Sequence, residues 1–320
     1  MSDRQTTRFL LERAFGQRVR SGVSMTGLTT FRTGGLAGWF LEVNRPDDLV
    51  AAVRFTVDHD LPLTVLGGGS NVLVGDAGVR GLVLRLRHGV VSRIGSNRIR
   101  AESGVTMNGL VRWAIQQGLG GLERWAGTPG SVGGAIYGNA HFEGRLLGDV
   151  VTRVGLVDST GVVSSVSRDA MRFGYDDSRV RHTGERVLWV EFSVAAGDLA
   201  TLRAAARESL GFRKRTQPLG CASAGCIFQN PCQEEGVLPR DMPCSAGALI
   251  EQAGLKGQRV GGAVVSSVHG NFIVNEGGAT SRDVRGLIEF CRAAVEDRFG
   301  IALRDELVYL GDFDEKSEAR

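Results

Sequence analysis

Near its end the chain shows its clearest pattern of apolar and polar positions. Between residues 281 and 300, apolar residues recur every three or four positions, the spacing that places them on one helix face. Ser281 is a suitable N-cap, Asp283 falls in the first turn, and Gly300 follows as a stop signal. The pattern predicts an amphipathic helix whose apolar face consists of Val284, Leu287, Ile288, Cys291 and Val295.

The first part of the chain mixes helical and strand periods. Helical spacing predicts an amphipathic helix over residues 4–20 and another over 47–59, after Pro46. One βαβ start followed by several short strands and a helix favours an α+β fold over a doubly wound one. The predicted strands cover residues 39–43, 63–66, 79–86, 90–94 and 99–102, and a helix is predicted over 106–117.

The predicted secondary structure changes near residue 197. Strands are predicted over residues 150–157 and 188–194 with a helical turn over 167–173, whereas a helix over 199–210 opens a mixed segment of helices and strands. We therefore expect a larger domain over residues 1–197, with the N-terminal helix as an appendage. A smaller α+β domain over 198–311 and a loose tail over 312–320 complete the predicted organisation.

Two glycine-rich loops carry the candidate chemistry. Glycine backbone N–H groups have no Cβ in the way, so such loops can wrap an anionic group such as a phosphate. An ordinary glycine-rich turn is the alternative for the first loop alone, but a second loop favours a phosphate. The first loop supplies Gly67, Gly68, Gly69, Ser70 and Asn71, and the second supplies Gly127, Thr128, Gly130, Ser131, Gly133, Gly134 and Ala135.

Composition restricts the possible partners. Glycine makes up 46 of 320 residues, about twice its usual share of ~7%, which indicates many tight turns or close approaches to a ligand. A net charge of +3 does not favour nucleic acid, and no apolar run reaches the ~18 residues of a membrane span. The five cysteines fit reduced thiols in a cytosol, and their spacing matches no zinc pattern, so we predict no metal site.

Two common nucleotide motifs are missing from the sequence. There is no GxGxxG after a predicted strand, which argues against a Rossmann dinucleotide site, and no GxxxxGK[ST], which argues against a P-loop. A nucleotide bound by the two glycine loops must therefore be held in another way.

Several longer motifs, taken together, are specific to one protein family. From about residue 31 to residue 311 the chain resembles the UDP-N-acetylenolpyruvoylglucosamine reductase (MurB) family, in its branch with the shorter architecture. The motifs that carry the resemblance are LGGGSNVLV at 66–74, GTPGSVGGA at 127–135, FGYxxS at 173–178, AGCIFQNP at 224–231, SAGALIEQAGLKG at 245–257, HGNFIVNEGGAT at 269–280 and IALRDELVYLG at 301–311.

The resemblance implies a flavoenzyme of peptidoglycan precursor synthesis. It implies an FAD-binding domain of the vanillyl-alcohol-oxidase type, held by the glycine loops, with NADPH as the hydride donor. The implied reaction reduces UDP-N-acetylglucosamine enolpyruvate to UDP-N-acetylmuramate in the cytoplasm, and we expect a monomer. Hydride arriving at the enolpyruvyl β-carbon pushes charge onto the α-carbon and carboxylate, so the site needs charge stabilisation there and a proton donor.

The resemblance also implies two catalytic positions. The terminal acidic residue of the family matches Glu306, which a strand register would place among apolar groups, where we expect its carboxyl pKa to rise. A surface strand carboxylate is the alternative. Cys226 stands where the family has its proton-donating serine, and a thiol can also protonate a carbanion-like intermediate. A small buried cysteine is the alternative there.

A third position departs from the family. The family pattern FGYRxS has an arginine that is implied to stabilise the intermediate, but this chain has Asp176, whose charge would oppose the developing negative charge. Arg179 or Arg181 is our candidate replacement. A catalytically weak paralogue that binds FAD or a UDP-sugar is therefore the alternative function.

Three further residues are assigned to substrate binding through the resemblance. They are Tyr175, Arg213 and Asn230. For Arg213, which begins a short basic run, a solvated basic turn is the alternative; for Tyr175, it is a packed tyrosine.

Overall fold

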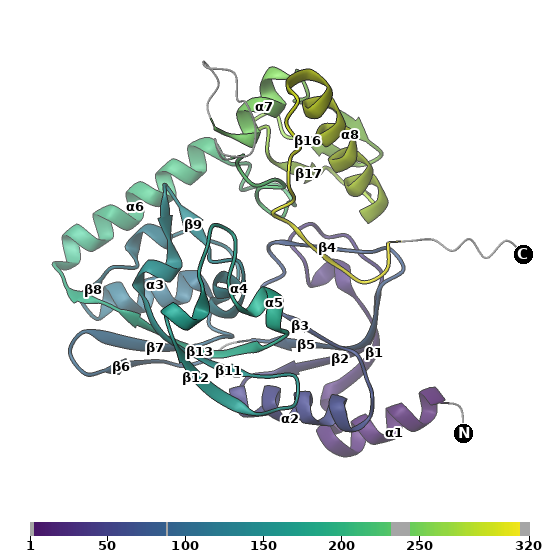
Figure 1. Ribbon diagram of the computed structural model, residues 1–320, viewed down its shortest axis with the longest axis vertical. Helices are drawn as coiled ribbons and strands as arrows, with labels where there is room; N and C mark the ends of the chain where they lie inside the picture. The colour runs from purple at the N-terminus through teal and green to yellow at the C-terminus, as the bar shows by residue number, and fades with distance from the viewer. Residues whose placement is uncertain (1–2, 88, 232–243, 314–320) are drawn as a thin grey trace, which may run out of the picture. The chain divides into compact units, whose positions relative to one another are not determined.

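The computed structural model describes residues 3–87, 89–231 and 244–313 (Figure 1). The chain forms two compact units, each assembled from separate segments of the sequence. Unit 1 takes its residues from 1–23, 37–68 and 80–211, and unit 2 from 24–36, 69–79 and 212–320. Both units mix helices with mainly antiparallel strands, which confirms the predicted α+β class. The functional division at residues 197 and 198 stays a prediction, and residues 314–320 of the expected tail lie outside the described residues.

A four-stranded sheet of order β1-β2-β5-β3 forms one part of unit 1. Strand β3 runs parallel to β5, with Leu63 opposite Leu82, and leads straight into the first glycine loop. Helix α2 begins with Pro46 in its first turn, as predicted, and buries Leu49 and Val53. The elements are β1 (Val19–Ser24), β2 (Leu36–Val43), α2 (Pro46–Asp58), β3 (Leu63–Leu66) and β5 (Val79–Leu86).

The predicted N-terminal helix over residues 4–20 was too long. Helix α1 covers Asp3–Phe15, and Gly16 then adopts a φ of +65°, a left-handed conformation that interrupts the helix. A 3₁₀ turn at Gly16–Arg18 leads into β1. The rings of Phe15 and Phe55 lie 5.3 Å apart, so α1 packs beside α2.

A five-stranded antiparallel sheet of order β12-β11-β13-β7-β6 forms the other part of unit 1. Helices α3 and α4 pack on it, and Leu110 of α3 and Ile136 of α4 share one core with Phe192 of β13. The predicted helical turn over 167–173 is only a 3₁₀ turn at Asp169–Met171. The elements are β6 (Val91–Ile94), β7 (Arg98–Glu102), α3 (Met107–Gln116), α4 (Val132–Tyr137), β11 (Val151–Val157), β12 (Val163–Ser167) and β13 (Arg186–Ser193).

Short elements complete unit 1. Some of them add buried residues, such as Leu119 and Val180, to the core of unit 1, and one of them, β9, places His141. They are β8 (Leu119–Gly120), β9 (His141–Phe142), β10 (Arg145–Leu146), α5 (Val180–Thr183) and β14 (Ala195–Ala196). Helix α6 (Leu199–Thr216) extends six residues beyond the predicted end at residue 210.

Unit 2 joins the end of the chain to two early segments. Strand β18 pairs in parallel with β4, so Val308 lies opposite Val72, and Phe31 and Leu73 are fully buried in the same core as Ile288. The elements are β4 (Val72–Val74), α7 (Ala246–Gln252), β15 (Arg259–Val260), β16 (Ala263–Val265), β17 (Ile273–Asn275), α8 (Ser281–Phe299) and β18 (Val308–Leu310).

Helix α8 confirms the predicted apolar face, because all five of its predicted core residues are buried. Its N-cap was misplaced by one residue: Thr280, not Ser281, accepts a hydrogen bond from the backbone N–H of Asp283. Asp283 in turn accepts from the N–H of Thr280, which completes a capping box. Gly300 ends the helix with a φ of +70°.

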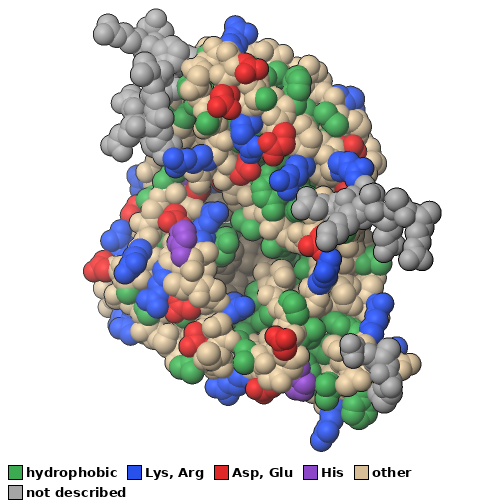
Figure 2. Space-filling view, turned by 45° about the vertical axis from the view of Figure 1, so that its right-hand side comes forward, with side chains coloured by type: hydrophobic (Ala, Val, Ile, Leu, Met, Phe, Trp, Pro, Cys, Tyr) green, Lys and Arg blue, Asp and Glu red, His purple; other side chains and the backbone are tan. Residues whose placement is uncertain are grey.

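The described helices include none that is both long and apolar enough to cross a bilayer. On the face shown in Figure 2, acidic and basic side chains are interspersed and form no single large patch of one sign.

Candidate functional site

The two glycine loops meet inside unit 1. A Cβ on Gly67 would lie 2.4 Å from Ser131 Oγ, and a Cβ on Gly68 would lie 2.5 Å from Gly130 Cα. Both distances are far below van der Waals contact, so the loops approach this closely only because glycine has no side chain. The structure therefore brings together Gly67, Gly68, Gly130 and Ser131, four of the residues predicted to bind a cofactor.

These four residues line a cavity of about 530 Å³ in unit 1. Its size lies within the range of small-molecule and cofactor sites. The aromatic ring of Trp113 and the guanidinium groups of Arg85 and Arg87 add an apolar and a cationic part. The remaining lining residues are Leu86, Gly89, Val91, Gly104, Val105, Thr106 and Gly109.

Arg85 makes this cavity suited to an anion. Its Nε is buried and has no hydrogen-bond partner among the described residues. Burial, and then the nearby charge of Arg87, lower the pKa of the Arg85 guanidinium from its usual value. An anionic ligand in the cavity would supply an opposite charge and so favour the charged guanidinium.

The other predicted loop residues do not line this cavity. Gly69, Ser70 and Asn71 belong to unit 2, and the Gly69 carbonyl accepts from the N–H of Thr30. Several N–H groups of the second loop bond within the protein instead: that of Gly127 to Asn108 Oδ1 at 2.7 Å, that of Gly133 to the Ser103 carbonyl at 2.9 Å, and that of Gly134 to Ser131 Oγ at 3.3 Å. These N–H groups are therefore already bonded within the protein, and the roles predicted for Thr128 and Ala135 stay predictions.

Cys226 and Glu306 come from adjacent backbone segments of unit 2. The N–H of Glu306 donates to the Ile227 carbonyl at 2.8 Å, and Phe228 forms a β-bridge with Asp305. Cys226 is half-buried rather than a small core cysteine. The structure thus places the two predicted catalytic residues on neighbouring stretches of chain.

Two asparagines fix these segments. Asn71 of the first glycine loop donates from Nδ2 to the Glu306 carbonyl at 3.1 Å. The buried Asn271 brackets Phe228, accepting from its N–H at 2.9 Å and donating to its carbonyl at 2.7 Å. Asn71 therefore positions Glu306 rather than only wrapping a phosphate.

The predicted strand register around Glu306 was wrong. Strand β18 begins at Val308, and the buried residues nearby are Leu303 and Leu307, whereas Ala302 and Arg304 are exposed. Glu306 itself is half-buried. The predicted rise in the pKa of its carboxyl stays a prediction.

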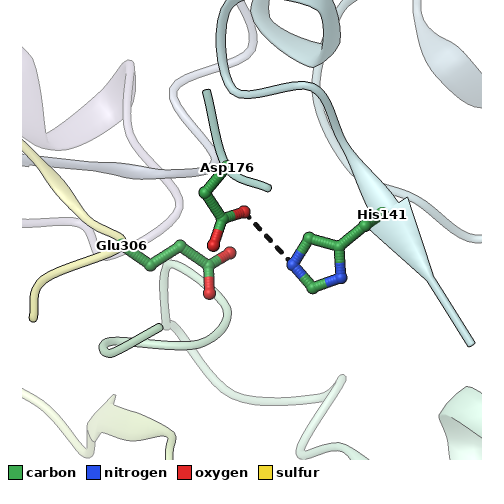
Figure 3. A group of neighbouring side chains, drawn as sticks. All are labelled: His141, Asp176 and Glu306. Atoms are coloured by element: carbon green, nitrogen blue, oxygen red, sulfur yellow. Dashed lines mark ion pairs between the residues drawn. The ribbon is translucent and has the colours of Figure 1, made fainter. Parts of the chain in front are cut away.

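Asp176 forms an ion pair with a residue that the sequence did not indicate. Its side chain is buried, and its Oδ1 lies 3.1 Å from Nε2 of His141 (Figure 3). The His141 ring also lies 4.7 Å from the ring of Tyr175. The sequence carried no signal for this pairing, because His141 and Asp176 lie in separate segments of the chain.

The loops that carry this pair are braced by Asn139. This buried side chain donates from Nδ2 to the Gly174 carbonyl at 2.6 Å and accepts at Oδ1 from the N–H of Gly148 at 2.8 Å. Ser178 Oγ donates to the Tyr137 carbonyl at 2.8 Å. Asp176 has a φ of +50°, an uncommon conformation for a residue with a side chain, which these contacts hold.

The two candidate replacements for the family arginine are both engaged. Arg179 makes a two-point ion pair with Glu185, at 2.7 and 3.0 Å. Arg181 donates from Nη1 to the backbone carbonyl of Asp176 at 2.6 Å, and its guanidinium lies over the Tyr137 ring. Arg181 thus supports the position of Asp176.

The predicted substrate-binding residues differ in their surroundings. Tyr175 is exposed. Arg213 lies in the last turn of α6 and is only 6% exposed, so it is not part of a solvated turn. Asn230 accepts from the N–H of Ala246 at the start of α7. The binding roles of these three residues stay predictions. Of the five cysteines, Cys232 lies outside the described residues.

The cavity and its glycine loops define a domain that binds a nucleotide-type cofactor without a Rossmann or P-loop motif. Residues 39–167 match the model of an FAD-binding domain, and residues 217–310 match the model of the C-terminal domain of UDP-N-acetylenolpyruvoylglucosamine reductase. The matched FAD domain contains the cavity lining and the second glycine loop, and the half-buried cationic Arg85 fits the anionic diphosphate of FAD.

Full-length relatives agree with both models. The chain is 38% identical to the UDP-N-acetylenolpyruvoylglucosamine reductase of Heliobacterium modesticaldum, over 90% of this chain and 89% of that protein. It is 37% identical to the enzyme of the same name from Geotalea uraniireducens, over 95% and 98%. The crystal structure of the MurB reductase from Thermus caldophilus superposes with a TM-score of 0.76, at 32% identity, over 92% of this chain and 99% of that one. The chain belongs to the UDP-N-acetylenolpyruvoylglucosamine reductase family.

Proposed function

We propose that this protein catalyses the NADPH-dependent, FAD-mediated reduction of UDP-N-acetylglucosamine enolpyruvate to UDP-N-acetylmuramate, a step of peptidoglycan precursor synthesis. The observation that carries the proposal is the glycine-lined cavity with its half-buried cationic Arg85, in a chain whose family resemblance extends over nearly all of its length. Bound FAD would accept two electrons from NADPH and supply the hydride.

The residues of the cavity would bind and orient the cofactor. Gly67, Gly68 and Gly130 let the backbone approach a diphosphate closely, and Arg85 offsets its charge. Trp113 provides an aromatic surface for an apolar ring system.

Cys226 and Glu306 would handle the proton. Hydride addition at the β-carbon leaves a carbanion-like α-carbon, which must gain a proton to complete the product. We assign that proton to the Cys226 thiol. Glu306, on the neighbouring backbone segment, would be the acid that returns a proton to the thiolate afterwards. The adjacent backbone segments of these two residues support this assignment.

The alternative of a catalytically weak paralogue that binds FAD or a UDP-sugar is not favoured. It rested on Asp176 and Cys226, and Asp176 now has a basic partner in His141. We also propose that the protein acts in the cytoplasm, which agrees with free thiols at the described cysteines. The monomeric state stays a prediction that size-exclusion chromatography with light scattering would check.

A two-step anaerobic measurement tests the function. NADPH is added first to the purified holoenzyme, and UDP-N-acetylglucosamine enolpyruvate follows. We expect flavin absorbance to bleach and then to return at a rate that depends on the enolpyruvyl substrate. UDP-N-acetylglucosamine, which lacks the enolpyruvyl group, is the matched control and should not restore it. The proposal fails if the reduced flavin persists equally with both compounds.

The variant Cys226→Ala separates the two steps. It removes the assigned proton donor, and Cys226 is not among the residues that line the cavity of unit 1. We expect NADPH to bleach its flavin normally and the substrate to restore the absorbance about 100-fold more slowly, within the range for a lost acid catalyst.

A further inference from the structure

A buried Asp176 carboxylate is unfavourable for the proposed reaction. Its side chain is 4% exposed, and its Oδ2 has no hydrogen-bond partner among the described residues. A buried carboxylate that stood alone beside a substrate gaining negative charge would repel it. His141 changes this balance, because its Nε2 lies 3.1 Å from Asp176 Oδ1 and a protonated imidazole there would offset the charge of Asp176.

The contact between the two side chains also decides which ring nitrogen can act. Asp176 Oδ1 lies 3.1 Å from Nε2 of His141, and because an ionised carboxylate only accepts hydrogen bonds, this contact calls for the proton on Nε2. Nδ1 is therefore the nitrogen that remains for a ligand, and in the doubly protonated ring it is a charged donor. The His141 side chain is about a quarter exposed, so a ligand can reach it.

The pair is held in advance of any ligand. Asn139, two residues before His141, bonds the Gly174 carbonyl two residues before Asp176. Arg181 holds the Asp176 carbonyl, and the ring of Tyr175 packs against that of His141. These contacts leave little reorganisation for the moment of reaction, which is what makes a fixed donor effective.

We propose that His141, held by Asp176, is the residue that donates a hydrogen bond and positive charge to the substrate carboxylate as negative charge develops during the reduction. The inference rests on the proposed function and on the resemblance of the FGYxxS motif, which implies that the enolpyruvyl group binds near Asp176. His141 is the catalytic residue, and Asp176 is the positioning residue. No bond to the imidazole forms; the electron pair stays on the substrate until the α-carbon is protonated.

The chain contains its own matched control. His182 and Asp177 form a second pair, with Nε2 and Oδ1 2.7 Å apart, but the His182 side chain is 67% exposed and the Asp177 side chain 45%. The variants His141→Ala and His182→Ala therefore remove the same group from two neighbouring carboxylates. A general effect of losing a surface histidine would appear in both.

The test measures the two half-reactions separately on the full-length holoenzyme. In His141→Ala we expect NADPH to bleach the flavin within about twofold of the wild-type rate. Reoxidation by UDP-N-acetylglucosamine enolpyruvate should slow about 100-fold, the usual effect of removing one charge-stabilising donor. His182→Ala should match the wild type in both steps. Reoxidation of His141→Ala at the wild-type rate would overturn the inference.

Two readouts distinguish catalysis from a structural role. Added imidazole should restore part of the reoxidation rate of His141→Ala and leave the wild type unchanged. Asp176→Asn, which keeps an acceptor but loses the charge, should slow reoxidation less than His141→Ala does and leave the bleaching step unchanged. If neither readout shows the expected change, the His141–Asp176 pair has only a structural role. If the wild type itself is never reoxidised by the substrate, the proposed function fails and the inference falls with it.

Discussion

At the scale of single residues, the contact between the two loops depends on glycines, because a glycine has no side chain to keep the backbones apart. Gly67 and Gly68 face Ser131 and Gly130 at distances that no side chain could occupy. The loops reach the same cavity from sequence positions more than 60 residues apart, so their contact is a tertiary one. A single methyl group is therefore enough to separate them.

Gly68→Ala tests this contact. Its Cβ would meet the Gly130 backbone at 2.5 Å, and overpacking of this kind costs about 1–3 kcal/mol, or about ten- to hundredfold in affinity. We expect the purified variant to retain less flavin and to bind added FAD at least about tenfold more weakly. Titration followed by flavin fluorescence measures this. Gly220→Ala is the control, because a Cβ there meets nothing within 4 Å. Equal FAD affinity in Gly68→Ala and the wild type would show that the loops do not need this approach.

At the scale of elements, helix α8 depends on an early segment of the chain. Asp76 accepts from the backbone N–H groups of Ser281 and Arg282, both at 2.9 Å. Ser281 Oγ also donates to the Val74 carbonyl at 2.5 Å. The first turn of α8 is thus capped twice, by Thr280 locally and by Asp76 from about 200 residues earlier. The negative charge also suits the positive end of the helix.

Asp76→Ala should lower the free energy of unfolding by about 1–2 kcal/mol, because it leaves two backbone donors without their cap. Asp76→Asn keeps one oxygen acceptor and should lose less. Urea unfolding followed by circular dichroism gives the midpoint, and an unchanged m-value would show that stability alone has changed. A wild-type midpoint for Asp76→Ala would mean that Thr280 caps α8 sufficiently by itself.

At the scale of the whole molecule, unit 2 is not a contiguous stretch of sequence. Strand β18 pairs with β4, and Phe31 and Leu73 are fully buried in a core otherwise built from residues after 223. Asn275 Nδ2 donates to the Phe31 carbonyl at 2.9 Å. The end of the chain therefore lacks part of its core and a strand partner when it is separated from residues 24–36 and 69–79.

A fragment of residues 198–311, the domain predicted from the sequence, should not fold alone. We expect it to show no cooperative thermal unfolding and poor dispersion of amide signals, because β18 would be an unpaired edge and the sites of two large buried side chains would be empty. The full-length chain under the same conditions is the control. Cooperative unfolding of the fragment would show that the early segments are dispensable for this core.

Much of this organisation could be predicted from local patterns. The period of helix α8, the strand at Leu63–Leu66 and the helix beginning at Pro46 appear as predicted because propensity, capping and packing agree in these segments. Predictions failed where a single backbone conformation decided the outcome, as at Gly16, or where the partner came from elsewhere in the chain. The register around Glu306 belongs to the second kind, since it is set by pairing with Ile227 and Phe228.

By itself, the sequence determined the α+β class, the two glycine loops and the family resemblance, because these depend on residue type and on spacing along the chain. Only the tertiary structure decided which residues meet. It joined Gly67 and Gly68 to Gly130 and Ser131, and it gave the buried Asp176 its partner, His141, from 35 residues earlier. Electrostatic pairing and close backbone approach act over a few ångströms of space, and a linear pattern carries no record of which distant residues will come within that range.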